Sequence, residues 1–424
     1  MQILKIDSMG SEVALLQKGL DRAGFGPLRP DGIFGRATDR ALREFQRSRG
    51  MASDGVAGPR TEAALLPWYT GYAVHTVAPG DTLWRIAGRY GATLLALETA
   101  NPDLDPFDLR PGQRLTVPFP FSVVPTDIPW SSELEAFCVR GLAARYPGSL
   151  TRQVIGHSVR VTPIFALTLG EGRRRVLFTG GHHANEWITA PLLMHYAEEL
   201  LSARAAGESV GGYAAEEIAL TARITLVPSV NPDGIDLVTG ALPPQAMVRP
   251  EAIAAAFPAI PFPDGWKANL EGVDLNLQYP AMWERAREIK FAQGFDRPAP
   301  RDYVGPAPLS APESRALADF TRELDPELIL AYHTQGNVIY WRYLDRAPEG
   351  ARELGLQLAA ASGYALEDAP YASGFAGFKD WFIAAFGRPG YTVEAGLGEN
   401  PLPLSQFEAL WRANAPLLST AALG

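Results

Sequence analysis

Apolar residues recur at helical spacing over the first seventy positions of this chain. Val13, Leu16 and Leu20 follow Ser11, a side chain that can cap a helix, and residues 41–46 repeat the spacing. The pattern predicts a small three-helix bundle over residues 1–68.

A short internal repeat lies within this predicted bundle. Residues 31–38 and residues 54–61 both read D-G-apolar-x-G-x-x-T. The glycines suit tight turns, and the threonine can begin a following helix. Each copy therefore predicts a turn that leads into a helix.

The pattern changes over residues 72–118. A short strand pattern comes first, and Asp81 or Thr82 can then cap a helix that buries Leu83 and Ile86. A second strand pattern closes the segment. We expect a βααβ module, which is small for an independent core.

The long C-terminal part alternates strand patterns with helix patterns. Residues 174–179 form an apolar run that ends in a Gly-Gly turn, and a helix pattern follows to about residue 201. Further strand candidates are residues 222–227, 328–332 and 391–393. This alternation predicts a mostly parallel or mixed sheet with helices on both faces and functional groups at the strand ends.

Composition limits the classes of function. Of the 424 residues, 47% are hydrophobic and 20% are charged, as is typical of globular proteins. The net charge of −9 falls almost wholly after residue 120 and argues against a nucleic-acid partner. The single cysteine, Cys138, excludes an intrachain disulfide framework and a cysteine zinc cluster. The first ten residues lack the apolar core of a signal peptide, and no run of ~18 apolar residues predicts a membrane helix.

Histidine and carboxylate side chains after the predicted strands suggest a metal site. His183 and Glu186 are three residues apart, so one helical turn can bring both to the same ion. Hydrolytic zinc sites use three nitrogen or oxygen ligands and leave a position for water. His333, directly after a predicted strand, is the best third ligand, although it could also be a buried strand-end histidine. His182 competes with His183, but Asn185 stands three residues after it, and we expect His182 either to support the ligands from behind or to be structural.

The two N-terminal segments resemble domains that bind bacterial cell walls. The D-G-x-x-G turns and the Phe45-Gln46 pair resemble the helical peptidoglycan-binding domain, with an unrelated helical module as the alternative. The run H-T-V-A-P-G-D-T-L-W-R-I-A and the later P-G-Q-R-L-T-V-P resemble a LysM domain, which binds N-acetylglucosamine-containing glycans, with a structural adaptor as the alternative. A proline-rich linker over residues 119–129 follows. The resemblance implies peptidoglycan as the partner, held by two modules with avidity.

Residues 130–424 resemble the metallocarboxypeptidase family of zinc peptidases. The motif G-G-H-H-A-N-E-W contains the family's H-x-x-E-W, and the other family motifs follow in the usual order. These motifs are Asn231-Pro-Asp-Gly234, Gly272-Val-Asp-Leu-Asn276, Ala331-Tyr-His333, Tyr371-Ala-Ser-Gly374 with Lys379-Asp-Trp381, and Tyr391-Thr-Val-Glu394. The resemblance implies an α/β fold with a mixed eight-stranded sheet flanked by helices.

The resemblance also implies the catalytic groups. Zn²⁺ would be held by His183, Glu186 and His333. Glu394 would take a proton from the zinc-bound water and later protonate the leaving amine. Asp274 would orient His183 from behind.

Asn276 and Tyr371 match family residues that bind substrate, and Tyr371 would close over the substrate.

Two other positions depart from the family pattern. Lys267 stands where the family has an arginine that stabilises the oxyanion, and it can act only as a point charge. Leu277 replaces the arginine that clamps a substrate's terminal carboxylate, so the usual release of a C-terminal amino acid is in doubt.

The lost clamp and the wall-binding modules indicate one branch of the family. This branch, the γ-D-glutamyl-L-diamino acid endopeptidases, cuts the γ-D-Glu–meso-diaminopimelate bond of peptidoglycan stem peptides. The alternatives are a zinc carboxypeptidase that trims another bond of the stem peptide, and a glycan-binding protein with a degenerate peptidase domain. Without a signal peptide we expect a cytoplasmic enzyme, in a sporulating or wall-recycling cell, or an enzyme that reaches the wall after release. The sequence gives no oligomeric state.

Overall fold

The computed structural model describes residues 3–424, and the chain forms two compact units. The first unit ends at Thr151, and the second covers Arg152–Gly424. Each unit is described by itself. No helix within residues 3–424 has the length and apolar character needed to cross a membrane.

The first unit begins with a helical bundle. Its helices are α1 (Ser11–Leu20), a π-helical turn η1 (Asp21–Phe25), α2 (Arg36–Ser48) and α3 (Pro59–Thr70). Val13, Leu42, Phe45 and Leu65 are fully buried between them. The apolar positions at helical spacing in the sequence therefore form the core of this bundle.

The two D-G turns of the internal repeat are each hydrogen-bonded to a glutamine side chain of the bundle. The side chain of Gln17 donates to Asp31 Oδ1 at 2.9 Å and accepts from the backbone N–H of Gly32 at 2.9 Å. Gln46 makes the equivalent bonds to Asp54 at 2.8 Å and to Gly55 at 3.0 Å. Each D-G turn is thus held by a buried glutamine from the preceding helix, which satisfies polar groups that burial would otherwise leave unpaired.

A βααβ module follows, with β1 (Tyr72–Thr76), α4 (Leu83–Tyr90), α5 (Leu94–Thr99) and β2 (Arg114–Pro118). The two strands pair antiparallel. Thr82 caps α4 by accepting from the Arg85 N–H at 3.2 Å. Ile86, Leu97 and Val117 are fully buried in its small core.

Residues 119–129 contain neither helix nor strand, but they pack against the rest of the first unit. Phe119 stacks on Trp68 with 5.9 Å between ring centroids. Val123 is fully buried, and its carbonyl accepts from the thiol of Cys138 on α6 (Ser132–Arg145). Helix α6 also packs against α3. The proline-rich segment is therefore extended yet ordered by its aromatic and apolar side chains.

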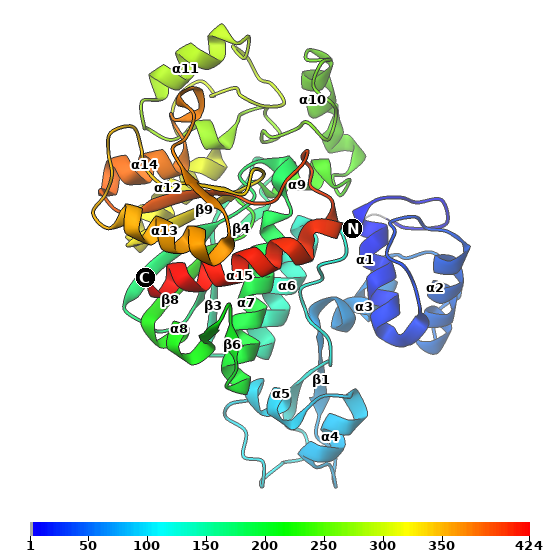
Figure 1. The fold of residues 1–424 in the computed structure, drawn as a ribbon. Coiled ribbons are helices and arrows are strands. Elements are labelled where there is room, and N and C mark those ends of the chain that lie inside the picture. The colour runs from blue at the N-terminus through cyan, green and yellow to red at the C-terminus, as the bar shows by residue number, and fades with distance from the viewer. Residues whose placement is uncertain (1–2) are drawn as a thin grey trace. The chain divides into compact units, whose positions relative to one another are not determined.

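The second unit is built on an eight-stranded mixed sheet in the order β11-β10-β12-β9-β5-β8-β4-β3 (Figure 1). The strands are β3 (Leu150–His157), β4 (Pro163–Leu169), β5 (Arg174–Thr179), β8 (Ala222–Val227), β9 (Leu328–His333), β10 (Val338–Tyr340), β11 (Ala365–Glu367) and β12 (Gly390–Glu394), with a small hairpin of β6 (Ser209–Val210) and β7 (Tyr213–Ala214) beside it. The α-helices are α7 (Thr189–Ala206), α8 (Ala215–Thr221), α9 (Pro232–Val238), α10 (Pro244–Ala255), α11 (Trp283–Ala292), α12 (Pro312–Leu324), α13 (Ala351–Ser362), α14 (Phe378–Phe386) and α15 (Phe407–Leu423). Short 3₁₀ turns are η2 (Ala184–Glu186), η3 (Leu275–Leu277), η4 (Tyr371–Ser373) and η5 (Leu404–Gln406). The predicted mixed sheet with flanking helices is confirmed.

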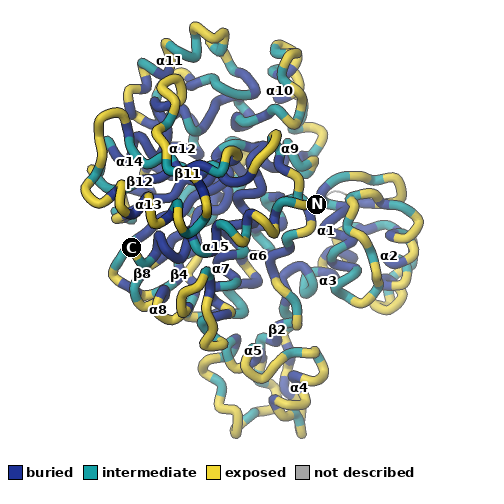
Figure 2. The backbone as a smooth tube through the Cα atoms, viewed as in Figure 1, coloured by how far each residue is buried: buried dark blue, intermediate teal, exposed yellow. Residues whose placement is uncertain are grey.

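Both faces of this sheet are covered by helices, which is why its central strands read as continuous apolar runs. Leu177, Ile329 and Ala331 share one core with side chains of α12 and α14. The alternating residues Phe178 and Leu330 face the other side, where α13 and α15 lie side by side (Figure 1). The tube coloured by burial shows these central strands as buried (Figure 2).

The strand order brings the carboxyl ends of four strands together. β12, β9, β5 and β8 are neighbours and run parallel. The predicted strand at residues 328–332 is one residue longer in the structure, so His333 is the last residue of β9. Chain segments that leave these strand ends supply the site described next.

Candidate active site

The candidate site lies at the carboxyl ends of the parallel strands. His333 ends β9 and Glu394 ends β12, and the two residues are partners in the register of this strand pair. The segment that follows β5 carries His183 and Glu186. A pocket at this edge is lined by all four side chains.

A tight turn, not a regular helix, carries the H-x-x-E motif. His183 has an extended backbone (φ −94°, ψ 133°), and Glu186 closes the 3₁₀ turn η2 by donating its N–H to the His183 carbonyl at 3.2 Å. Residues three apart eclipse each other in a 3₁₀ turn, so both side chains point to the same side. The turn is also held from outside, because the Ala184 N–H donates to the Lys267 carbonyl at 3.1 Å. Helix α7 begins only at Thr189.

Three side chains converge there with the donor set that a zinc ion prefers. One ligand atom from each of His183, Glu186 and His333 lies within 4.8 Å of the others. The two Nδ1 atoms are 3.2 Å apart, and the Glu186 carboxylate lies 3.0 Å from Nδ1 of His183 and 2.9 Å from Nδ1 of His333. Two imidazoles and one carboxylate facing a common point fit Zn²⁺ with a position left for water.

Asp274 sets the orientation of His183. Its Oδ1 accepts from His183 Nε2 at 3.1 Å and from the backbone N–H of Asn276 at 3.2 Å, and its Oδ2 accepts from the backbone N–H of Asp302 at 3.0 Å. With Nε2 donating to Asp274, the Nδ1 lone pair of His183 faces Glu186 and His333. A carboxylate behind a histidine in this way fixes the ring and its tautomer.

The electrostatic field of the site favours a positive charge at this point. Burial alone lowers the pKa of His183, but the carboxylates of Glu186 and Asp274 outweigh it and raise this pKa to about 9. Burial likewise acts to raise the pKa of Asp274, yet the neighbouring His183 holds it below its usual range. A field that stabilises a charged imidazole also stabilises a metal cation bound between the same groups.

Lys267 and Glu394 line the same pocket as the ligand cluster of His183, Glu186 and His333. Lys267 Nζ lies 2.8 Å from Glu186 Oε1, and this carboxylate raises the pKa of the lysine against the effect of its burial. Burial raises the pKa of the Glu394 carboxyl. A carboxyl group with a raised pKa at the end of β12 is suited to proton transfer.

The structure separates the two residues expected to bind substrate. Asn276 lines the pocket, and its Nδ2 lies 3.4 Å from His333 Nε2 while its Oδ1 accepts from the Phe378 N–H at 3.0 Å. Tyr371 does not line this pocket. Its ring is largely exposed, packs edge-on against Phe375 and lies 5.9 Å from the Arg285 guanidinium.

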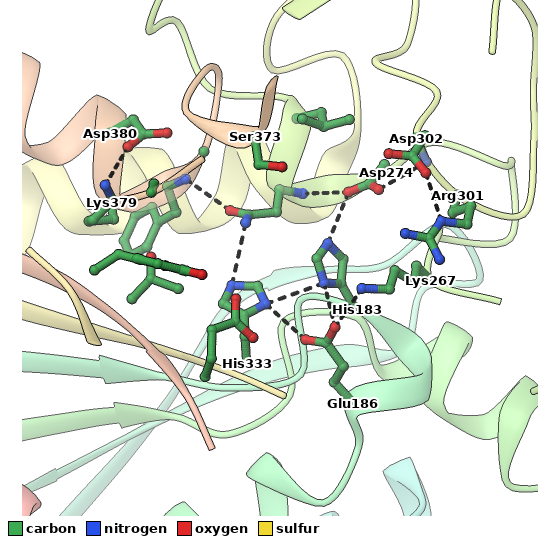
Figure 3. A pocket seen from close by; sticks show the side chains of 18 of the residues that line it. His183, Glu186, Lys267, Asp274, Arg301, Asp302, His333, Ser373, Lys379 and Asp380 are labelled. Carbon is green, nitrogen blue, oxygen red and sulfur yellow. Dashed lines mark hydrogen bonds and ion pairs between the residues drawn. The ribbon is translucent and has the colours of Figure 1, made fainter. Parts of the chain in front are cut away.

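Further charged side chains flank the cluster of His183, Glu186 and His333 on two sides (Figure 3). On one side, Asp302 pairs with Lys290 at 2.5 Å and with Arg301 at 2.6 Å. On the other side, Lys379 and Asp380 form a buried ion pair of 2.7 Å. Lys379 and Asp380 were visible in the sequence only as part of a loop motif. Arg301, Asp302 and Lys290 carried no signal, because nothing local in the chain places them beside the histidines.

His182 is not one of the converging ligands. It is fully buried, its Nε2 lies 3.2 Å from the Tyr279 hydroxyl, and its ring stacks on His333 with 5.6 Å between centroids. Burial lowers the pKa of this imidazole. A neutral ring packed behind His333 serves to position it.

Comparison with protein families agrees with this geometry. The zinc carboxypeptidase family profile matches residues 136–416, which is more than half of the chain. The chain belongs to the zinc carboxypeptidase family. As a zinc carboxypeptidase relative it is a metallopeptidase whose cofactor is Zn²⁺, and the converging His, Glu and His side chains are the group that can hold it. Two further profiles match the N-terminal modules, a peptidoglycan binding domain over residues 9–65 and a LysM domain over residues 75–118.

Two curated relatives are similar to parts of this chain. Gamma-D-glutamyl-L-diamino acid endopeptidase 1 of Lysinibacillus sphaericus is 39% identical over 274 residues, which cover 65% of this chain and 67% of the relative. The spore cortex-lytic enzyme of Bacillus cereus is 37% identical over 81 residues, which cover 19% of this chain and 31% of that enzyme.

A solved structure has a fold similar to that of this chain. Carboxypeptidase A from Helicoverpa armigera superposes with a TM-score of 0.54 at 18% identity and covers 84% of this chain and 98% of its own. The expected carboxypeptidase-like fold is therefore confirmed.

Proposed function

We propose that this zinc peptidase hydrolyses the bond between γ-D-Glu and meso-diaminopimelate in peptidoglycan stem peptides. One observation carries the proposal. The groups for metal-assisted hydrolysis are together, whereas Leu277 stands in place of the arginine that would clamp a C-terminal carboxylate. The 39% identical relative, named a γ-D-glutamyl-L-diamino acid endopeptidase, supports the same bond.

His183, Glu186 and His333 are the proposed metal ligands. A zinc ion held there supplies a Lewis acid that lowers the pKa of a bound water toward ~7 and polarises the scissile carbonyl. Asp274 keeps His183 in the tautomer that leaves Nδ1 free. Because the ligands come from the rigid turn η2 and the end of β9, their positions are fixed before substrate binds.

Glu394 is the proposed general base. It lies in register with His333, so its carboxylate faces the same pocket. It takes the proton of the attacking water and later gives a proton to the leaving amine, and its raised pKa suits both steps.

Lys267 is the proposed oxyanion-stabilising group. In the structure its ammonium is bound to Glu186. An ammonium group can stabilise developing negative charge, but it cannot make the two parallel bonds of a guanidinium.

Asn276 and Tyr371 are the proposed substrate contacts near the leaving group. Asn276 is already in place beside His333. Tyr371 stands on the 3₁₀ turn η4 outside the pocket, so its contact requires the loop around it to close.

The buried pair Lys379–Asp380 supports a diamino acid as the leaving residue. Diaminopimelate ends in an amino-acid centre that carries both an ammonium and a carboxylate. Lys379 can bind the carboxylate and Asp380 the ammonium, so both members of the pair exchange one charged partner for another without being left unpaired. Lysine, the other common stem diamino acid, ends in an ammonium alone.

The N-terminal modules supply the proposed targeting to the polymer. We assign peptidoglycan binding to residues 1–68 and 72–118, a linker to residues 119–129, and catalysis to residues 130–424. Two weak contacts to one insoluble polymer raise the local substrate concentration for the peptidase.

The test is product analysis with the zinc-loaded chain. Purified L-Ala-γ-D-Glu-meso-diaminopimelate-D-Ala is incubated with the enzyme, and products are identified by mass spectrometry. We expect L-Ala-D-Glu and diaminopimelyl-D-Ala. Loss of D-Ala alone would favour a carboxypeptidase that trims another bond, and no product at all would favour a binding protein.

A further inference from the structure

We infer that Arg301 binds the free α-carboxylate of the γ-D-glutamyl residue and thereby selects γ-linked substrates. The inference rests on the proposed function and names a partner for the free carboxylate of the residue that supplies the scissile carbonyl. Arg301 belongs to none of the family motifs in this sequence, and it lines the pocket beside the ligand cluster (Figure 3).

Arg301 is held in position through the same carboxylate that orients the metal site. Its Nε lies 2.6 Å from Asp302 Oδ2, and the backbone N–H of Asp302 donates to Asp274 Oδ2 at 3.0 Å. Asp274 in turn accepts from His183 at 3.1 Å. The distance between the guanidinium and the metal ligands is therefore set by a short series of hydrogen bonds.

The two terminal nitrogens of the Arg301 guanidinium have no hydrogen-bond partner within residues 3–424. Within residues 3–424, Asp302 is the hydrogen-bond partner of Arg301 and engages Nε alone, so the two terminal nitrogens make no bond to protein. The side chain is 41% exposed, although its neighbours Asp302 and Lys290 are largely buried. A planar pair of N–H donors in this setting matches a carboxylate in two-point geometry.

Arg301 and Lys290 together carry one positive charge more than the carboxylate that pairs with both of them. Asp302 is a single carboxylate shared by Lys290 and Arg301. Lys267 is already paired with Glu186. The group with Asp302 at its centre thus has a net charge of +1, and an incoming anion compensates it.

The γ-linkage places an anion where this charge lies. In a γ-glutamyl amide the scissile carbonyl belongs to the side chain, and the α-carboxylate remains free a short methylene chain away. In an ordinary α-linked peptide that carboxylate is consumed in the scissile bond itself. A cation at a fixed short distance from the metal ligands, on the side opposite Lys379 and Asp380, distinguishes the two linkages.

The experiment compares two substrates that differ at this one group. The first is L-Ala-γ-D-Glu-meso-diaminopimelate, and the second carries γ-D-isoglutamine, whose α-carboxylate is an amide. We expect wild-type kcat/KM to favour the free acid by about 10- to 100-fold, as befits one charged two-point contact. Arg301→Met should remove this preference by lowering kcat/KM for the acid while leaving the amide within about threefold. Arg301→Lys should restore part of it.

Binding measurements and controls separate recognition from folding. Calorimetric affinity for the product L-Ala-D-Glu should fall in Arg301→Met, whereas affinity for L-Ala-D-isoglutamine should not. Arg297→Met removes an exposed arginine that stacks on Phe257 and should change neither ratio. Zinc content and thermal unfolding of each variant show whether the site is intact.

Three results would overturn the inference. Equal loss of activity on both substrates in Arg301→Met would make Arg301 a structural residue, with the proposed function intact. A wild-type enzyme that cleaves both substrates equally would likewise reject Arg301 as the selector. Cleavage of neither substrate by zinc-loaded wild type would overturn the proposed function and this inference together.

Discussion

Glu394 lies directly beside His333, because the two are paired residues at the ends of the adjacent parallel strands β12 and β9. The ladder of backbone hydrogen bonds therefore sets the spacing between a proposed base and a proposed metal ligand. Neither residue depends on a flexible loop for its position.

Replacing Glu394 with Gln should abolish hydrolysis without loss of metal. The amide keeps the size of the side chain but cannot accept a proton, so we expect kcat to fall by about 10²- to 10⁴-fold. Steady-state rates and zinc stoichiometry measure the two effects. Glu367→Gln, at the exposed end of β11, which β10 separates from β12, is the matched control and should be neutral. Full activity in Glu394→Gln would reject this base.

Replacing Asp274 with Asn should weaken zinc binding. The carboxylate behind His183 fixes its tautomer and raises its basicity, so its loss should reduce zinc affinity by about 10- to 100-fold. Competition with a chelator measures the change. Asp296→Asn alters an exposed carboxylate and serves as the control. Unchanged affinity in Asp274→Asn would show that the hydrogen bond does not tune the metal site.

The pair Lys379–Asp380 should determine which diamino acid is released. Lys379→Met removes the partner of the distal carboxylate, so kcat/KM for diaminopimelate substrates should fall by about tenfold or more, while the value for an L-Lys substrate should change much less. Asp380→Asn should lower both, because both substrates carry the ammonium. Equal effects of Lys379→Met on the two substrates would assign the ion pair to folding instead.

Glu62 should make the helical bundle less stable as pH rises. Burial raises its pKa from 4.5 to about 7, although Tyr69 donates a hydrogen bond to it at 2.9 Å. Between pH 4.5 and 7 the folded state keeps a proton that the unfolded state has released, so the free energy of unfolding falls with rising pH and levels off above pH 7.

Glu62→Gln should remove this pH dependence. Above pH 7 we expect the variant to be more stable by on the order of 2–3 kcal/mol, since no buried carboxylate has to ionise. Hydrogen exchange of α3 in the full chain, corrected for intrinsic rates, measures local stability. Glu44→Gln, on the exposed side of α2, should leave the pH profile unchanged. A wild-type profile that is flat from pH 5 to 8 would contradict the prediction.

The order of the motifs was enough to name the residues that converge. The strand before His183 and the strand that ends at His333 are apolar runs buried on both faces, and such runs are legible in a single sequence. A helical turn was expected to bring His183 and Glu186 together, and the structure has a 3₁₀ turn there, which is hydrogen-bonded to residues 266–267. That long-range contact leaves no local pattern in the chain.

The repeat at Asp31 and Asp54 likewise combines a feature that the sequence predicts with contacts that only the structure shows. The glycines predicted the D-G turns. Their partners Gln17 and Gln46 lie in other parts of the chain, so these contacts are identified only in the packed structure.

The sequence by itself determined the family, the helical and βααβ modules, and the set of histidines and carboxylates at the strand ends, because local periodicity and motif order encode these features. The tertiary structure decided which charges share the pocket. Arg301, Asp302 and Lys290 meet His183 only through packing of segments far apart in the chain, and the free fork of Arg301 follows from which of its nitrogens Asp302 occupies. The substrate selectivity proposed here depends on that arrangement, since an ion pair is a property of distance in space and not of position in the sequence.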